Sequence, residues 1–365
     1  LSQITPSIFS SLGLDSAVDH LAMGQSPMGR ELLFLIDGFG VNTFSQYADV
    51  MPTMSRMFNH GLIQTAFPST TATSLATLTT GELPGVHGML GYTVQVPRSG
   101  GRLLNALKWD ERVDPENWQP VETLFQRASA AGINVTHVAA KRYENSGFTR
   151  AVFRGANYKG ANVVADLVSE TKAALQATPS FVYLYVNDLD SAGHSDGVGS
   201  DKWIAALSMI DQMVSQLMKE VPKGTRIWVT SDHGMINVGE KIVIGQDNDL
   251  AIDIATIAGE PRARHLYLAD GASESAIHES AQRWREFLGE KAIVHTREEA
   301  KNSGLFGSQV SADASDRIGD LVVIAQGDLI LIEAMRENQE SAMVGHHGGE
   351  TDIESYVPLL TAVIN

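Results

Sequence analysis

The hydrophobic positions of the chain fall into short continuous runs, separated by longer segments in which apolar residues recur at helical spacing. Three runs stand out, at residues 32–36, 181–186 and 227–230. Each is apolar throughout instead of alternating with polar residues, as in strands that are buried on both faces. This order of strand and helix predicts an α/β fold with a doubly wound, mainly parallel sheet and helices on both faces.

The clearest predicted helix starts near Ser200 and ends before Pro222. Its apolar side chains recur at steps of three and four: Trp203, Leu207, Ile210, Val214 and Leu217. Two further helices are predicted at residues 120–131 and 161–175, and a strand at residues 133–139 lies between them. Strands and helices therefore alternate through this half of the chain.

Two stretches depart from this pattern. Residues 91–118 are rich in Gly, Pro, Asn and Trp and lack periodicity, which predicts a long excursion of the kind that usually covers a site. Residues 261–342 contain short predicted strands and a helix at residues 274–287. Because the chain afterwards returns to a motif that needs the first half, we interpret residues 1–365 as one domain with a smaller α+β subdomain inserted at residues 261–342.

Carboxylate and imidazole side chains gather at the ends of the predicted strands. They follow three strands and recur in a late glycine-rich segment: Asp37; Asp190 and His194, in an expected loop; Asp232 and His233; and His346 and His347. Loops at the carboxyl ends of parallel strands converge on one crevice, so these segments are expected to meet. Since the chain has no cysteine, any metal ion there must be held by histidines and carboxylates.

Each of these residues has a simpler interpretation when it is taken alone. An Asp at a strand end most often forms a turn or caps a helix, and a lone His is most often a core or surface residue. We assign that ordinary role to five histidines: His20, His60, His137, His278 and His295. The coincidence of Asp and His at three strand ends and in a late loop favours a metal site.

A hydroxyl-rich segment, residues 67–74, precedes another predicted helix. Such residues ordinarily cap the helix. The functional alternative is that one threonine of the segment is a nucleophile. The helix dipole and the free N–H groups at a helix start stabilise an alkoxide and an incoming phosphate, and metal coordination lowers the pKa of a hydroxyl.

Composition narrows the range of partners. With 27 Lys and Arg against 43 Asp and Glu, the net charge of -16 repels nucleic-acid polymers. No apolar run approaches the roughly 18 residues of a membrane-spanning helix. We therefore expect a globular, cytoplasmic protein that acts on a small molecule. Because the chain begins at Leu1, a removed signal peptide stays an alternative, and the oligomeric state is left open.

The motifs together resemble the alkaline phosphatase superfamily and, within it, the nucleotide pyrophosphatase/phosphodiesterase branch. They occur in that family's order: Asp37-Gly38, Phe67-Pro68 with Thr71, His87-Gly88, Asp190 with His194, Asp232-His233-Gly234, and His347-Gly348. The resemblance covers about residues 31–360. It implies an alkaline phosphatase-like fold, two zinc ions or other divalent ions, and hydrolysis of phosphodiester or pyrophosphate bonds in nucleotide-like small molecules.

The resemblance also implies roles for single residues. It assigns one metal ion to Asp37, Thr71, Asp232 and His233, and the other to Asp190, His194 and His347. The family's register places the nucleophile at Thr71, with Thr70 as its neighbouring alternative, and His346 is the corresponding alternative to His347. The implied mechanism is a pair of in-line displacements through a phospho-threonine intermediate.

Two positions depart from the family's pattern. Tyr92 stands where many relatives have an Asn that contacts a phosphoryl oxygen, and its hydroxyl is a candidate replacement. Asp188 replaces the usual glutamate before Asp190. Lys141, which precedes Arg142 after a predicted strand, is expected to bind an anionic part of the substrate, as lysines do in the related phosphonoacetate hydrolases. A solvated basic pair is the ordinary alternative.

Three other functions stay open at this point. A phosphonoacetate hydrolase would use the same metal ions and threonine, with a basic cluster for the substrate carboxylate. A phosphomonoesterase would need a strong cation for the extra phosphate charge, and residues 69–81 contain no Arg, so we expect diesters to be preferred. A metal-stabilised binding module typically lacks a nucleophile, and the threonine and the full ligand set argue against it.

Overall fold

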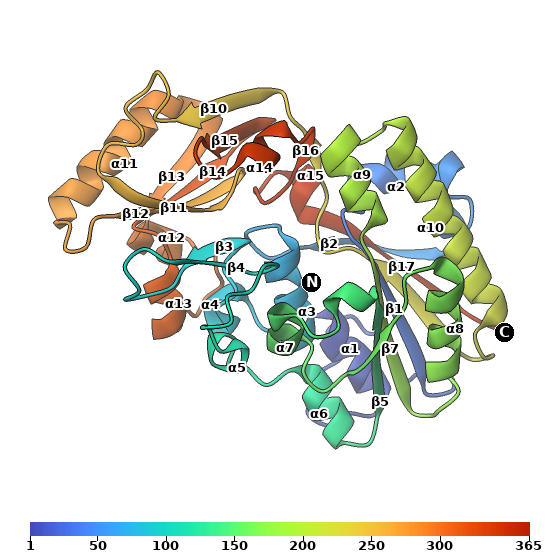
Figure 1. Ribbon diagram of the computed structural model, residues 1–365. Helices are drawn as coiled ribbons and strands as arrows, with labels where there is room; N and C mark the ends of the chain where they lie inside the picture. The colour runs from blue at the N-terminus through green and yellow to red at the C-terminus, as the bar shows by residue number, and fades with distance from the viewer.

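A seven-stranded sheet runs through the larger lobe of the computed structural model, which describes residues 1–365 (Figure 1). Its strands, in spatial order, are β2 (Phe58–Gln64), β17 (Tyr356–Val363), β8 (Arg226–Thr230), β1 (Arg30–Ile36), β7 (Ser180–Val186), β5 (Asn134–Ala139) and β6 (Asn157–Gly160). Pairing is parallel from β8 to β6, and β17 runs antiparallel to both of its neighbours. The predicted mainly parallel sheet is therefore confirmed.

The pairing register aligns the carboxyl ends of the three central strands. Leu35 of β1 lies opposite Tyr185 of β7 and Thr230 of β8. Because parallel strands all leave the sheet at the same edge, the residues that follow β1, β7 and β8 meet there. The polar residues at these strand ends, far apart in sequence, thus belong to one region of the molecule.

Alternate side chains of β1 point to opposite faces of the sheet, and each face is covered by helices. Leu32, Phe34 and Ile36 pack in one buried cluster with α8 (Val164–Ala174) and α10 (Asp201–Glu220). Leu33 and Leu35 pack in the other with α1 (Ile4–Ser11), α3 (Thr71–Thr80) and α6 (Leu124–Ala130). A sheet covered on both faces is the doubly wound arrangement that the continuous apolar runs predicted.

Capping residues set the helix starts, which agree with the prediction for α10 but not for α6. The Ser200 hydroxyl accepts the Trp203 N–H at 3.3 Å, and α10 ends two residues before Pro222. Thr123 and Gln126 form a capping box, so α6 begins at Leu124, later than the predicted residue 120.

A second lobe, at the upper left of Figure 1, contains a four-stranded antiparallel sheet. Its strands, in spatial order, are β11 (Ile254–Glu260), β12 (Ala263–Leu268), β14 (Leu321–Ala325) and β13 (Ala292–Thr296), with α11 (Glu274–Leu288) packed on them. β10 (Glu240–Ile244) pairs beside it with β15 (Leu329–Glu333). The predicted insertion at residues 261–342 contains most of these elements. β10 and β11 precede residue 261 and still belong to the second lobe, where β11 pairs with β12 across a tight turn.

Residues 91–118 join the two lobes. They contain the hairpin of β3 (Thr93–Gln95) and β4 (Leu103–Asn105), followed by α5 (Pro115–Trp118). The Thr93 hydroxyl donates to the Gly259 carbonyl at 2.7 Å, and the Gln95 N–H donates to the Tyr267 hydroxyl at 3.2 Å. The excursion is thus held against the second lobe, and its first residues lie beside the site described below.

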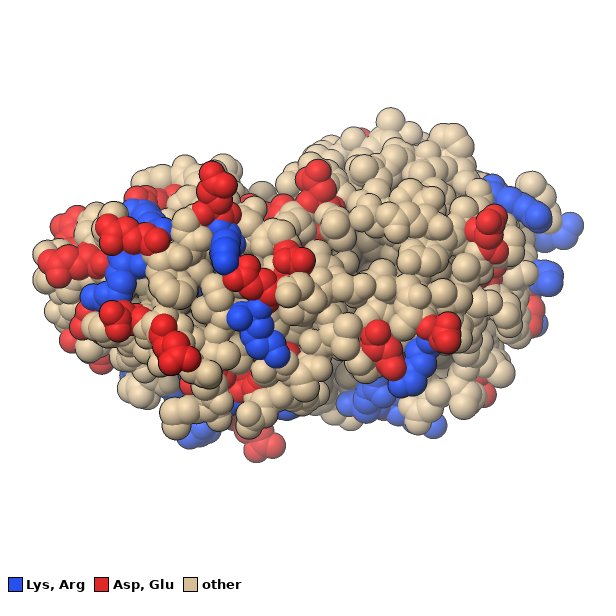
Figure 2. Space-filling model, turned by 90° about the horizontal axis from the view of Figure 1, so that it is seen from above, with Lys and Arg blue, Asp and Glu red and all other residues tan.

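The remaining elements are short. They are α2 (Val41–Gln46), α4 (Pro84–His87), α7 (Gly147–Val152), α9 (Asp188–Asp196), β9 (Ile236–Asn237), α12 (Arg297–Asn302), α13 (Ala312–Arg317), α14 (Asn338–Ala342), β16 (Gly345–His346) and α15 (Asp352–Ser355). None of the helices has the length and apolar character that crossing a membrane requires. Figure 2 shows acidic and basic side chains interspersed over the second lobe, without a continuous basic patch on that face.

Candidate metal and catalytic site

The first group of candidate ligands lies where β1 and β8 end. Asp37 follows β1, and Asp232 and His233 follow β8. The Nε2 atom of His233 lies 3.2 Å from Asp37 Oδ1 and 3.6 Å from Asp232 Oδ2, and all three side chains are buried. One ligand atom from each lies within 4.8 Å of the others, so the three can surround a single ion.

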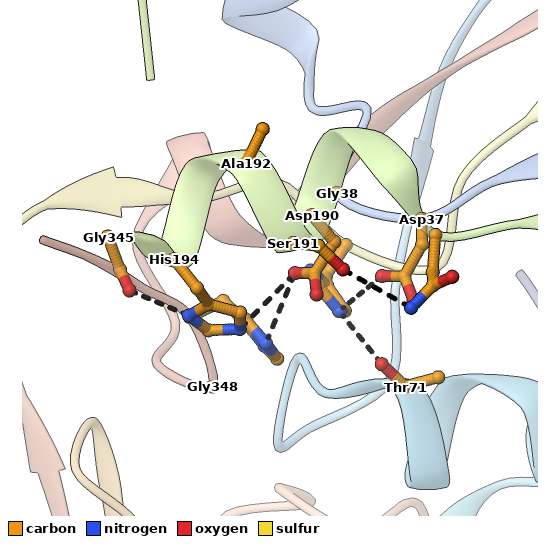
Figure 3. A network of polar contacts seen from close by, with 12 residues as sticks. Asp37, Gly38, Thr71, Asp190, Ser191, Ala192, His194, Gly345 and Gly348 are labelled. Atoms are coloured by element: carbon orange, nitrogen blue, oxygen red, sulfur yellow. Dashed lines mark hydrogen bonds and ion pairs between the residues drawn. The ribbon is translucent and has the colours of Figure 1, made fainter. Parts of the chain in front are cut away.

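The second group combines a helix with a late loop. Asp190 and His194 were expected in a loop, but they lie one turn apart on α9, where residues four apart share one face of a helix (Figure 3). His194 Nε2 is 3.3 Å from Asp190 Oδ1, and His347 Nε2 is 3.8 Å from the same oxygen. This group also fits around one ion.

The two groups adjoin each other, and Thr71 lies beside them. The rings of His233 and His347 are stacked with their centroids 3.5 Å apart. Thr71 is the first residue of α3, and its Oγ1 lies 3.2 Å from His233 Nε2 (Figure 3). Thr70 occupies the N-cap position, and His346 Nε2 contacts the Glu340 carbonyl at 2.9 Å. Thr71 thus contacts the first group directly and His347 belongs to the second, while the His346 ring lies 5.8 Å, centroid to centroid, from that of His194.

Backbone carbonyls orient the three candidate histidine ligands. Each ring faces one carbonyl oxygen with its Nδ1 atom: His194 with Gly345 at 2.8 Å, His233 with Gly234 at 2.9 Å, and His347 with Ser69 at 2.9 Å. A ring that donates from Nδ1 keeps its Nε2 lone pair for another partner, and this is the usual arrangement of histidines that bind metals. All three Nε2 atoms face the carboxylates.

The carboxylates of the site carry oxygens without hydrogen-bond partners. Asp37 Oδ1, Asp190 Oδ1 and Asp232 Oδ2 are buried and make no hydrogen bond. Burial, together with the neighbouring Asp37, raises the pKa of Asp232 to about 7. Burial opposes protonation of His233, but Asp232 and Asp37 outweigh it and raise the pKa of His233 to about 10, so these carboxylates favour a positive charge, a proton or a cation, at the point that Nε2 faces. These unpartnered oxygens and crowded negative charges fit divalent cations, and Asp with His is a donor set that suits Zn²⁺.

A cavity of about 460 Å³ opens in front of both groups and of Thr71. Its wall is partly apolar, with Leu75 and Phe148 among the lining side chains, and it includes Tyr92, as expected for a substrate contact. The Tyr92 N–H donates to Glu260 Oε2 at 2.9 Å, which holds this residue at the cavity wall.

Arg142, and not Lys141, lines this cavity. The side chain of Lys141 lies beside Gly160 instead. Arg142 Nη2 donates to the Tyr143 hydroxyl at 2.8 Å and to Asn187 Oδ1 at 3.1 Å, so its hydrogen bonds go to uncharged groups. Lys141 was the expected anion contact by resemblance to the lysines of phosphonoacetate hydrolases. The short helical turn of residues 141–143 directs the next side chain, Arg142, to the cavity instead.

Glu260 and Tyr185 were not identified from the sequence. Glu260 is buried, lines the cavity and leaves Oε1 without a hydrogen bond, and burial raises its pKa to about 8. It ends β11, so its strand-end position was the available signal, but β11 belongs to the second lobe and not to the large sheet. The Tyr185 hydroxyl donates to Asp37 Oδ2 from within β7, where no sequence pattern distinguishes it from its apolar neighbours.

His87, which belongs to the His-Gly motif, is a core residue here and lies apart from both ligand groups. Its Nδ1 accepts the Met89 N–H at 3.1 Å and its Nε2 lies 3.0 Å from Thr77 Oγ1. Both contacts are satisfied when the ring is neutral and carries its proton on Nε2. Complete burial lowers the pKa of His87 from 6.5 to about 3.

This burial predicts an acid-sensitive contribution of His87 to stability. Between pH 6.5 and about 3 the unfolded chain binds a proton that the folded chain does not, so the free energy of unfolding decreases as the pH falls through this window. Between pH 7 and pH 5, we expect the free energy of unfolding of His87→Gln to decrease by about 2 kcal/mol less than that of the wild type. Urea unfolding at both pH values measures this difference, and equal pH dependence in both proteins would contradict it.

The fold and the two adjoining Asp and His groups define an α/β protein of the alkaline phosphatase superfamily. The family model described as "Type I phosphodiesterase / nucleotide pyrophosphatase" matches residues 32–350, and the chain belongs to this family. The resemblance predicted from the motifs is thereby confirmed.

Two kinds of relatives agree with this assignment. Human ectonucleotide pyrophosphatase/phosphodiesterase family member 1 is 27% identical over 230 residues, which are 58% of this chain and 24% of the relative, so the match spans about a quarter of that protein. Murine ectonucleotide pyrophosphatase/phosphodiesterase 5 superposes with a TM-score of 0.71 at 17% identity, covering 90% of this chain and 87% of the neighbour. Phosphonoacetate hydrolase from Sinorhizobium meliloti superposes with a TM-score of 0.69 at 19% identity, covering 92% and 90%. The structural neighbours establish the common fold.

Proposed function

We propose that the protein is a metal-dependent hydrolase that cleaves phosphodiester or pyrophosphate bonds of nucleotide-like small molecules, with Thr71 as the nucleophile. The observation that carries this proposal is the position of Thr71 Oγ1, 3.2 Å from His233 Nε2 and in one cavity with both ligand groups. Family membership supports the class of reaction.

The two groups would hold two divalent ions, which we propose to be zinc. Asp37, Thr71, Asp232 and His233 would bind one, and Asp190, His194 and His347 the other. Ions bound there supply positive charge to the attacking and leaving oxygens of an in-line displacement.

Thr71 carries the covalent steps of the proposed mechanism. Its Oγ1 releases its proton to solvent and attacks phosphorus, the leaving-group oxygen departs with the electron pair of the broken P–O bond, and a phospho-threonine ester forms. Free N–H groups in the first turn of α3 stabilise the negative charge that gathers at this position. Water then displaces Thr71 from the opposite side, which releases the phosphate product and returns a proton to the hydroxyl.

The substrate class is inferred from the cavity and from the relatives. A neighbour's structure holds AMP in an inactive variant of murine ectonucleotide pyrophosphatase/phosphodiesterase 5, and the bacterial phosphonoacetate hydrolase holds phosphonoacetate. The partly apolar wall with Leu75 and Phe148 suits the organic part of a nucleotide. Arg142 is a cation at the same cavity whose hydrogen bonds go to uncharged groups, which supports phosphonoacetate hydrolysis as the second candidate.

The ratio of diester to monoester hydrolysis tests this choice. We expect kcat/KM to be higher for p-nitrophenyl thymidine monophosphate than for p-nitrophenyl phosphate. Arg142→Met is expected to lower kcat/KM for phosphonoacetate by about tenfold, because the charge-assisted contact at this exposed position is partly screened by water. Lys141→Ala, a matched change outside the cavity, is expected to leave these values within about twofold.

A wild-type preference for p-nitrophenyl phosphate that disappears in Arg142→Met would contradict the diesterase assignment. Faster turnover of phosphonoacetate than of both p-nitrophenyl esters would favour the second candidate instead. Failure of all three substrates to react in the presence of Zn²⁺ would count against hydrolytic function altogether.

A further inference from the structure

A buried ion pair lies next to the loops that carry the two ligand groups. Arg262, in the turn between β11 and β12, meets Glu354 of α15 in a two-pronged contact. Arg262 Nε lies 2.9 Å from Glu354 Oε1, and Nη2 lies 2.6 Å from Oε2. Both side chains are completely buried, so each charge depends on the other for compensation.

Glu354 is hydrogen-bonded to the loops that carry ligands of both groups. Its backbone carbonyl accepts the N–H of Gly234, the residue after His233, at 2.8 Å. Its side-chain Oε1 accepts the N–H of Gly349, two residues after His347, also at 2.8 Å. One residue therefore connects the first ligand group, through Gly234, with the second, through Gly349.

The backbone around Glu354 leaves these loops no room to shift. A Cβ atom added to Gly234 would lie 1.9 Å from the Ile353 carbonyl oxygen, and one added to Gly40, three residues after Asp37, would lie 2.9 Å from it. Such distances mean that glycine backbone packs directly on residues 353–354. The loops after β1 and β8 thus rest on the same short segment that holds the His347 loop.

Arg262 ties this arrangement to the second lobe. Its Nη1 donates to the Leu329 carbonyl of β15 at 2.5 Å, while its other nitrogens hold Glu354. The guanidinium group therefore links β15 of the second lobe to Glu354, in the segment against which the ligand loops pack. Its neighbours Glu260 and Pro261 line the cavity, so the same turn contributes to both the cavity wall and the support of the ligands.

We propose that Glu354, held by Arg262, is a positioning residue that sets the spacing of the two ligand groups and thereby the metal affinity of both. The inference rests on the proposed two-metal site. Metal ions require their donors at narrowly defined distances, and residues that orient the ligands contribute strongly to affinity. Removing the charge of Glu354 leaves Arg262 buried without a partner, which displaces the loops that contain His233 and His347.

The test is a zinc titration of the metal-free full-length protein against a competing chelator. We expect the wild type to bind two Zn²⁺, and Glu354→Gln to bind both ions about 10- to 100-fold more weakly. The matched control is Glu31→Gln. Glu31 forms an equally buried pair with Arg226 at the opposite end of β1, with Arg226 Nη2 2.9 Å from Glu31 Oε1. The variant Glu31→Gln is expected to lower the melting temperature without changing the zinc affinity.

A second variant separates positioning from folding. The double variant, Arg262→Met with Glu354→Met, replaces the ion pair by apolar side chains of similar size. Replacing a buried ion pair in this way often costs a protein little stability. We expect this double variant to melt closer to the wild type than Glu354→Gln does, with zinc binding still weakened at both sites. Arg262→Lys, which keeps the charge, is expected to retain more zinc affinity than Arg262→Met.

The outcomes distinguish this inference from the proposed function. Fewer than two Zn²⁺ bound by the wild type would overturn the two-metal site itself. If the wild type binds two, unchanged zinc affinity in Glu354→Gln or in the double variant would overturn the positioning role alone. Weakening at one site only, or an equal loss of affinity in Glu31→Gln, would also overturn it.

Discussion

Thr71→Ala is expected to lower kcat/KM for p-nitrophenyl thymidine monophosphate by about 10³-fold or more, equivalent to about 4 kcal/mol of transition-state stabilisation. The substitution removes the single hydroxyl that lies beside His233 at the start of α3. Residual turnover would have to come from direct attack of water. Folding should be preserved, because alanine is the strongest helix former and Thr71 is only partly buried.

Thr70→Ala is the matched control for this experiment. Thr70 is the N-cap residue of α3, but its side chain makes no capping hydrogen bond, so its removal costs little. For Thr70→Ala we expect a decrease in kcat/KM of less than about tenfold and the zinc content of the wild type. Thr71→Ala removes one of the four proposed ligands of its ion and is expected to keep much of its zinc. The reverse order of the two effects would assign the nucleophile to Thr70.

His194→Ala is expected to lose one of two zinc ions and at least about 100-fold in activity. The ring is held by the Gly345 carbonyl with Nε2 toward Asp190, so its removal takes one imidazole donor from the second ligand group. Several kcal/mol of charge stabilisation depend on each ion in a two-metal site. Elemental analysis of freshly purified protein, without added metal, measures the ion count alongside the assay.

His278→Ala serves as the control for the metal count. His278 lies on the exposed side of α11, and its Nδ1 contacts the Glu274 carbonyl within the same helix. We expect this variant to keep two ions and full activity. One transition metal or none in the wild type, or a loss of metal in His278→Ala, would contradict the proposed ligand assignment.

The second lobe holds the cavity wall at Tyr92, the residue that we expect to take the place of the family's Asn. Tyr92 is held at the cavity by Glu260, and Thr93 by the carbonyl of Gly259, so β11 positions this part of the site. The cavity is therefore bounded from both lobes.

Some features of the fold follow from local sequence patterns. Strands β1, β7 and β8 were predicted because burial on both faces leaves continuous apolar runs, and α10 because its buried residues recur at helical spacing and Ser200 caps it. The motifs around them predicted the family, which the family model confirms. Their proposed roles in binding and catalysis stay predictions until the variants are measured.

Other features were decided by tertiary structure. Asp190 and His194 lie on a helix although glycine and polar residues around them suggested a loop, because packing of α9 against α10 and β16 overrides weak local preference. Arg142 faces the cavity and Lys141 does not, since the turn after β5 sets the direction of each side chain.

Contacts between side chains far apart in the sequence are the features that sequence patterns predict least. Arg262 and Glu354 are 92 positions apart, and nothing near either residue indicates that they meet. Glu260 likewise becomes part of the cavity only when β11 is brought against Tyr92 and the His347 loop. Periodicity and spacing report which face of an element is buried, because burial acts locally on each side chain. Which distant charge compensates another depends on how the two lobes pack, and only the folded structure determines that.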